Sequence, residues 1–310
     1  MFLLVFESVF SLFMMMAFGF YFCKKNILND KVTSALSYLL LNLALPCLII
    51  SSMQVDFSRD MLDRAIFCLL VFAGIQVLCL ILGFLISGFI RLKPPQSGVF
   101  KFAMAFPNTI YMGMPVVRHL FGDEGMFITV ICSIMFNLTC FTLGAWLLSD
   151  KSGDKKRISL KSIITPASIA SFVGFGFFVT SLHIWAPIVS TMRSVGGMTT
   201  PLSMLVLGAM LSKSSNFAEV FADFRLYVLG FFRLLVAPIA VFFAIRPFVG
   251  DSLTLTVLTL LTGMPAAAVL AILAKNMGSD AETSSKAVFL TTMLSMLTLP
   301  LLSLFIEYFI

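Results

Sequence analysis

The stretch NTIYMGMP, residues 108–115, lies inside an otherwise apolar part of the chain. A proline removes a backbone donor and its ring clashes with the preceding helical turn, and a glycine lets the backbone leave helical geometry. In lipid, each freed backbone N–H or C=O group costs several kcal/mol unless a partner satisfies it. We therefore expect a helix that is broken between Asn108 and Pro115, with the break buried in protein or facing a wet cavity.

A second interruption, Gly263-Met264-Pro265, follows in the other half of the chain, and Pro265 comes 150 residues after Pro115. Pro201 follows Pro46 by 155 residues, an offset close to half of the 310 residues. Two pairs of prolines at nearly the same offset favour an internal repeat. Paired interruptions in two halves indicate the binding site of a secondary transporter.

The composition excludes most soluble proteins. Hydrophobic residues make up 59% of the chain and charged residues 12%, whereas soluble domains carry about 25% charged residues. The six cysteines form no CxxC motif and no cysteine–histidine metal spacing, so they are expected to be small packing residues. The net charge of +6 could attract nucleic acid, but its distribution favours a role in membrane topology. No metal, cofactor or nucleic-acid partner is expected.

Apolar runs long enough to span a bilayer recur along the whole chain. Such a span needs about 20 apolar residues. Ten helices are predicted, at residues 2–22, 32–53, 65–90, 97–120, 126–148, 161–182, 187–212, 224–246, 253–276 and 287–309.

The basic residues predict the orientation of these spans. Of the 21 Lys and Arg residues, 15 fall on one set of alternate loops and 5 on the other. Because basic loops stay in the cytoplasm, this bias places the basic loop 150–157 inside and both termini outside. The loop divides the chain into a first five-helix repeat (1–149), a linker (150–160) and a second repeat (161–310). An odd number of helices in each half gives the halves opposite orientations.

Helices four and nine are expected to carry most of the substrate contacts. If they cross at their breaks, unwound backbone offers carbonyls to a cation, and half-helix N-termini offer partial positive charge to a carboxylate. A structural kink with satisfied polar groups is the alternative. The residues assigned to substrate binding are Asn108, Thr109, Tyr111, Gly113, Pro115, Gly263 and Pro265, and the expected crossover or kink prolines are Pro46, Pro115, Pro201 and Pro265.

Three further polar residues have two interpretations each. Asn42, expected to be buried, either bonds the carbonyl freed by Pro46 or contacts substrate. Asn137 either lines the pocket or forms a hydrogen bond between helices. Arg233 is the one basic residue deep in a span, where a charge is costly. It either binds a substrate carboxylate or forms a structural pair with an acid such as Glu7.

Other features are assigned structural roles. Gly196 and Gly208 are expected to allow close helix packing. His119 and His183 stand at helix ends, where a proton-relay role is not favoured. The chain contains no HExxH, GxSxG or P-loop motif, so no enzyme is expected.

Several segments together resemble the auxin efflux carrier family, which includes plant auxin carriers and bacterial permeases of the malate and malonate type. They are NLALP (42–46), NTIYMGMP (108–115), TPLSMLVLGAML (200–211), MPAAAVLAILAKNMGSDAE (264–282) and TTMLSMLTLPLL (291–302). A short loop after helix five and the alanines 266–268 in place of an asparagine indicate the bacterial branch.

The resemblance implies an all-α polytopic membrane protein. Its ten helices would form two inverted five-helix repeats with crossed, broken helices four and nine, as in the bile-acid sodium symporter fold. It implies a scaffold (1–53 and 161–212) and a mobile transport core (65–148 and 224–309). Asn108, Gly113 and Pro115 fall on the first crossover by motif match, and Pro265 on the second.

The expected function is secondary active transport of a small organic anion, most simply a carboxylate, by elevator-type alternating access in the plasma (bacterial inner) membrane. A channel would need a continuous polar stripe, which no span carries. A receptor or scaffold would leave the paired breaks without a purpose. Coupling to H⁺ or Na⁺ and the formation of a homodimer are left open.

Overall fold

The computed structural model describes residues 2–149, 165–212 and 217–310. Within those ranges the protein is helical, with one isolated backbone bridge between loops. Seven helical segments there are long and apolar enough to cross a membrane, and 166–180 and 252–262 form shorter apolar helices. The polytopic membrane class is therefore confirmed, while the ten-helix inverted repeat stays a prediction. The basic loop 150–157 and the linker 150–160 lie outside the described residues.

The helices follow the apolar runs closely. In the first half they are α1 (Phe2–Lys24), α2 (Asp30–Leu39), α3 (Leu45–Ser52), α4 (Arg59–Phe89), α5 (Gln96–Ala105), α6 (Met114–Thr139) and α7 (Ala145–Leu148). In the second half they are α8 (Pro166–Thr180), α9 (Ala186–Gly197), α10 (Thr199–Ser212), α11 (Phe217–Ala222), α12 (Phe224–Phe231), α13 (Ala237–Ile245), α14 (Ser252–Thr262), α15 (Val269–Met277) and α16 (Ala281–Phe309).

The expected break between the spans 97–120 and 126–148 is present, but it is a kink rather than a loop. The segment α6 consists of two helical parts that meet within residues 121–125. The helix is interrupted there at Gly122, whose φ of 59° and ψ of −144° are open to glycine and strained for other residues. A single apolar stretch, Thr109–Leu148, therefore covers parts of both expected spans.

Three prolines are each preceded by a wide π-helical turn rather than a break. In these turns the N–H groups of Leu45, Met114 and Ala237 donate to the carbonyls five residues earlier. A proline has no N–H to donate, and its ring clashes with the carbonyl oxygen one turn earlier. The wider π-helical turn provides room for the ring. The turns are Leu40–Ala44 before Pro46, Thr109–Gly113 before Pro115, and Phe232–Val236 before Pro238.

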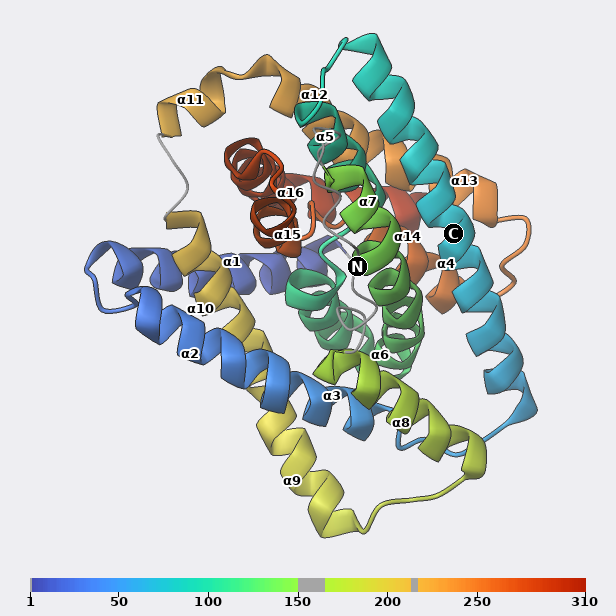
Figure 1. Cartoon of the computed structure of the whole chain (residues 1–310). Coiled ribbons are helices and arrows are strands. Elements are labelled where there is room, and N and C mark those ends of the chain that lie inside the picture. The colour runs from blue at the N-terminus through green and yellow to red at the C-terminus, as the bar shows by residue number, and fades with distance from the viewer. Residues whose placement is uncertain (1, 150–164, 213–216) are drawn as a thin grey trace.

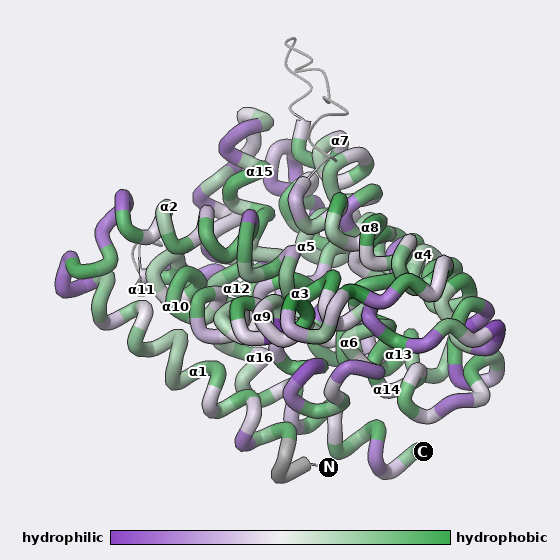
Figure 2. The backbone as a smooth tube through the Cα atoms, turned by 90° about the horizontal axis from the view of Figure 1, so that it is seen from below, coloured by the Kyte–Doolittle hydropathy of each residue, from purple (hydrophilic) through white to green (hydrophobic). Residues whose placement is uncertain are grey.

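The helices gather in two groups (Figure 1). In one group α1 packs along α10, α2 also contacts α10, and α3 packs against α8 and α9. In the other, α4 packs against α5 and α6, and α16 contacts α12 and α15. The groups touch where α1 contacts α6 and α16, and where α6 contacts α8 and α3. Both chain ends lie at one side of the molecule, away from α7 and α15 (Figure 2).

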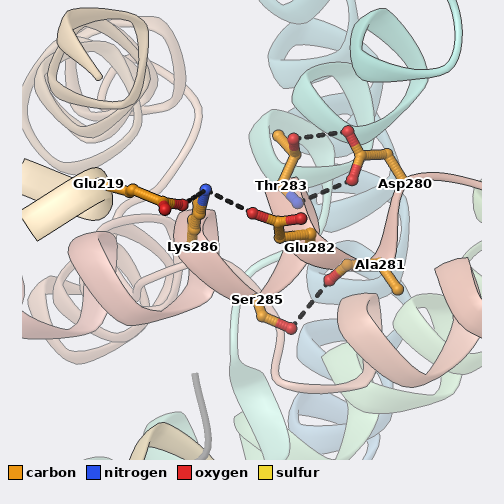
Figure 3. Close-up of polar contacts among 7 residues, drawn as sticks. All are labelled: Glu219, Asp280, Ala281, Glu282, Thr283, Ser285 and Lys286. Carbon is orange, nitrogen blue, oxygen red and sulfur yellow. Dashed lines mark hydrogen bonds and ion pairs between the residues drawn. The ribbon is translucent and has the colours of Figure 1, made fainter. Parts of the chain in front are cut away.

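Ionic contacts tie the short helix α11 to the start of α16 (Figure 3). Lys286 Nζ lies 2.9 Å from a carboxylate oxygen of Glu219 on α11 and 2.6 Å from one of Glu282. The Asp280 side chain caps α16 by accepting hydrogen bonds from the backbone N–H and the hydroxyl of Thr283, at 2.8 and 2.6 Å. The cap satisfies orphan donors of the first helical turn, so the long helix begins at a defined residue.

Glycines allow the close approach of α1 and α10, as expected for Gly208. A Cβ atom at Gly208 would overlap the carbonyl oxygen of Met16, and one at Gly19 would overlap that of Leu205. Gly196 is similarly close to the backbone of Leu48. The prediction of close packing at Gly196 and Gly208 is confirmed.

We expect Gly208→Ala to lower the unfolding temperature, because the added methyl group must push α1 away from α10. Such overpacking costs about 1–3 kcal/mol. Gly74→Ala is the matched control, since no atom lies within 4 Å of a Cβ placed there, and it should leave the protein as stable or slightly more stable. Thermal unfolding of both purified variants in one detergent checks this, and equal unfolding temperatures would contradict it.

Candidate functional site

Two non-helical segments, 106–108 and 263–268, meet in the interior. The first separates α5 from the π-turn 109–113, and the second separates α14 from α15. The N–H of Asn108 donates to the carbonyl of Pro265 at 2.8 Å, and the N–H of Ala267 donates to the carbonyl of Phe106 at 3.0 Å. Together with the antiparallel bridge between Pro107 and Ala266, these bonds satisfy backbone groups that the broken helices leave free.

The first break lies upstream of its predicted position. Gly113 has helical dihedrals (φ −60°, ψ −53°), and Pro115 stands in the first turn of α6. The chain leaves the helix at Phe106, which is extended because Pro107 follows it. The expectation that Gly113 releases the backbone is therefore wrong. Its lack of a side chain serves packing, since a Cβ would lie 3.0 Å from the Leu261 side chain.

Asn108 occupies the centre of a tight turn at this break. Its φ of −76° and ψ of 63° are those of an inverse γ-turn, and the Thr109 N–H donates to the Pro107 carbonyl at 2.8 Å. The Asn108 side chain is 2% exposed, and its Nδ2 has no hydrogen-bond partner among the described residues. A buried donor without a partner costs about 1–3 kcal/mol, so it points to a ligand or another function.

The other residues predicted to bind substrate near the break differ in how much of their surface is exposed. Thr109, Gly263 and Pro265 are buried. Tyr111 is partly buried and packs against a small cluster that includes Leu40 and Leu202. Tyr111 therefore faces the helix group of α2 and α10.

Thr291 of α16 supports the second break, and the sequence analysis did not assign it a role. Its hydroxyl accepts a hydrogen bond from the Ala266 N–H at 3.2 Å and donates to its own helix at the Ala287 carbonyl. The residue is fully buried. It lies in the TTMLSMLTLPLL segment, but nothing in that segment indicates a partner 25 residues away.

Two asparagines differ from expectation. Asn42 is exposed rather than buried, and its amide donates to the Tyr38 carbonyl of its own helix at 2.9 Å. Asn137 is 3% exposed, and its side-chain Nδ2 has no hydrogen-bond partner within the described part of the chain. The bond expected of Asn137 between helices is made by Thr139, whose hydroxyl lies 2.9 Å from the Gln76 side-chain oxygen on α4.

Arg233 is fully buried, and its Nη1 donates to the Met104 carbonyl at 2.7 Å. No described carboxylate lies within ion-pair distance, so the expected alternative of a pair with Glu7 is wrong. Pro201 does not kink a continuous helix, because it stands in the first turn of α10, after the end of α9 at Gly197.

A cavity of about 390 Å³ opens beside the broken helix, between α1, α6 and α10. Arg118 and His119 line it from α6, and the Arg118 side chain forms no ion pair or hydrogen bond with any other described residue. These two residues follow Pro115 by three and four positions, so all three share one face of the helix. The full lining is Ser8, Ser11, Leu12, Met15, Pro115, Arg118, His119 and Thr200.

The sequence analysis assigned no role to Arg118 and set His119 aside. Their spacing of three and four positions from Pro115 places them on the same helix face as this proline, and that spacing is visible in the sequence. The α1 residues 8, 11, 12 and 15 also lie on one helix face. An unpaired guanidinium among hydroxyl groups can hold a carboxylate or phosphate by charge-assisted hydrogen bonds.

We expect Thr291→Val to destabilise the protein by about 1–3 kcal/mol, since it leaves the buried Ala266 N–H without an acceptor. Thr292→Val is the matched control. It is equally buried, but its hydroxyl bonds only the Val288 carbonyl of its own helix, so its loss should be nearly neutral. Thermal unfolding compares the two variants, and an equal loss in both would show that the bond to Ala266 contributes nothing.

Comparison with known proteins identifies the family. A family described as membrane transport protein matches residues 4–303. The chain is 28% identical to an uncharacterized transporter of Methanothermobacter thermautotrophicus, over 96% of this chain and 97% of that one. It is 25% identical to one of Methanocaldococcus jannaschii, over 89% and 90% of the two chains, and 23% identical to the uncharacterized transporter YfdV of Escherichia coli, over 67% and 63%. The chain therefore belongs to the auxin efflux carrier family of membrane transport proteins.

Proposed function

We propose that the protein is a secondary transporter of a small organic anion with a carboxylate group. The observation that carries the proposal is an unpaired arginine, Arg118, in a cavity beside the broken helix. Arg118 follows Asn108 by ten residues, about 15 Å along a helix, so an anion held by Arg118 lies on the same half-helix that begins at the first break.

The electrostatics of the cavity suit an anion. Arg118 supplies a guanidinium to the cavity wall, and the His119 imidazole lies on the same wall. Hydroxyl groups of Ser11 and Thr200 can donate to the oxygens of a carboxylate. A volume near 390 Å³ fits a small organic acid.

The buried amide of Asn108 supplies a second donor group. Its free Nδ2, at the start of the half-helix that leads into α6, could bind a carboxylate oxygen when the anion moves inward. The positive end of that half-helix favours the same charge. In this proposal Arg118 recruits the anion and Asn108 binds it during transport.

An elevator motion is the mechanism we propose. The cavity lies between α1 and α10, which belong to the proposed scaffold (1–53 and 161–212), and α6 of the proposed core (65–148 and 224–309). The same boundary is bridged by Arg193 of α9 and Asp123 of α6, at 3.7 Å. A core that slides along the scaffold would break this exposed ion pair and carry the anion with it, at little energetic cost.

The remaining expectations are part of the same proposal. The plasma (bacterial inner) membrane, outside termini and a homodimer follow from the resemblance and the charge bias. Uptake measured with a sodium gradient, with a pH gradient and with neither distinguishes Na⁺ coupling from H⁺ coupling.

The decisive experiment is uptake of labelled malonate, malate and acetate by proteoliposomes that contain the purified protein. We expect Arg118→Gln to raise the KM for the transported acid at least tenfold, which corresponds to about 1.4 kcal/mol of lost binding. Arg59→Gln is the control, because it removes an exposed arginine that lines neither described cavity.

Two outcomes would contradict the proposal. Liposomes that take up none of the three acids would speak against carboxylate transport. An equal change in KM for the Arg118 and Arg59 variants would mean that only overall charge matters.

We also expect Asn108→Leu to abolish transport without destabilising the protein. The amide Nδ2 has no hydrogen-bond partner among the described residues, so its replacement by an apolar group of similar size removes a buried unsatisfied donor. The variant should unfold at the same or a higher temperature than the wild type. A stable variant with normal uptake would exclude Asn108 from the binding site.

A further inference from the structure

Arg233 carries the most deeply buried charge in the described structure, and the proposed transport site does not use it. It is the largest of the fully buried side chains and lines neither of the two described cavities. Among described groups, the one that lies beside the guanidinium and can carry charge is the thiol of Cys79. The charge thus has no acidic partner, although burying such a charge alone is costly.

The partner of Arg233 is a helix end. Met104 lies in the last turn of α5, which ends at Ala105. In a continuous helix the Met104 carbonyl would accept from the N–H of Asn108, but that N–H donates to Pro265 instead. The break therefore leaves the Met104 carbonyl free, and Arg233 Nη1 supplies the missing donor at 2.7 Å.

The positive charge of Arg233 is also favoured by the negative electrostatic potential at the C-terminal end of α5. The last carbonyls of a helix have no donors of their own, and together they carry about half a negative charge. A cation at this end is stabilised without a carboxylate. The Nε and Nη2 atoms have no hydrogen-bond partner among the described residues, so the bond from Nη1 to the carbonyl end of α5, beside the Cys79 thiol, is the contact that fixes the guanidinium.

The second break needs no such cation. The Gly263 N–H donates to the Thr259 carbonyl at 3.0 Å, and the Met264 N–H donates to the Leu261 carbonyl at 3.3 Å. The end of α14 is therefore closed by a local turn, and no arginine or lysine of the described ranges bonds to its carbonyls. Of the two breaks, it is the one at the end of α5 whose carbonyl bonds to a charged side chain from a different helix in the described ranges.

In secondary transporters with broken helices, half-helix carbonyl ends coordinate the coupling cation. We propose that Arg233 is a resident cation that fills this position at the end of α5, so that no free ion is needed there. Arg233 is then a positioning residue for the crossed breaks rather than a ligand of the substrate. This inference concerns the proposed transport core, but it can be tested without any substrate.

The experiment uses Arg233→Ala, which vacates the site, and small cations as probes. We expect the variant to unfold at a lower temperature than the wild type. Guanidinium chloride at low millimolar concentration should raise its unfolding temperature by at least about 2 °C, whereas choline chloride and urea should not. The wild type and the control Arg59→Ala should show no such response.

A second pair of variants covers the case in which Arg233→Ala does not fold. Arg233→Lys keeps the charge and should fold and take up anion, whereas the neutral Arg233→Met should do neither. A folded Arg233→Ala that does not respond to guanidinium would overturn the inference, as would Arg233→Met matching Arg233→Lys in stability and uptake.

The outcomes separate this inference from the proposed function. A guanidinium response in a protein that transports no carboxylate would support the resident cation and contradict the transport proposal. Normal carboxylate transport by an Arg233→Ala protein that shows no response to cations would support the transport proposal and contradict the resident cation.

Discussion

The structure depends on one requirement, that every backbone group freed inside the apolar core must find a partner. The two broken segments meet it by exchanging hydrogen bonds, from Asn108 to Pro265 and from Ala267 to Phe106. Groups that this exchange does not cover are satisfied by side chains from other helices, Thr291 for the Ala266 N–H and Arg233 for the Met104 carbonyl. Non-helical backbone is tolerated at this depth because protein surrounds it on all sides.

Prolines have two different effects in this chain, and the difference lies in the partners available to the freed carbonyls. Before Pro115 and Pro238 the helix only widens into a π-turn, in which the Thr109 and Phe232 carbonyls accept from donors on their own helix. At Pro107 the chain leaves the helix altogether, and the freed groups pair with residues 265–267. A break therefore forms where a second backbone segment lies beside the proline.

Two arginines serve different chemistry because their surroundings differ. Arg118 lines an open cavity with hydroxyl groups and has no partner in the described structure, so its charge is available to an anion. Arg233 is fully buried against a helix end, where the field of the carbonyls holds it. A guanidinium that is already committed to the protein is a poor ligand for a substrate that must come and go.

The sequence by itself determined the membrane class, most helix positions, the family, and the presence of polar, proline-containing interruptions in both halves. These features follow from hydrophobicity and from backbone chemistry over a few neighbouring residues. The tertiary structure decided which proline breaks its helix, that Asn42 is exposed, that Arg118 and His119 line a cavity, and that Arg233 bonds to Met104. Each of these depends on contacts between distant residues, such as Arg233 and Met104, which are 129 positions apart. No local pattern encodes such contacts, because they arise only when the helices pack.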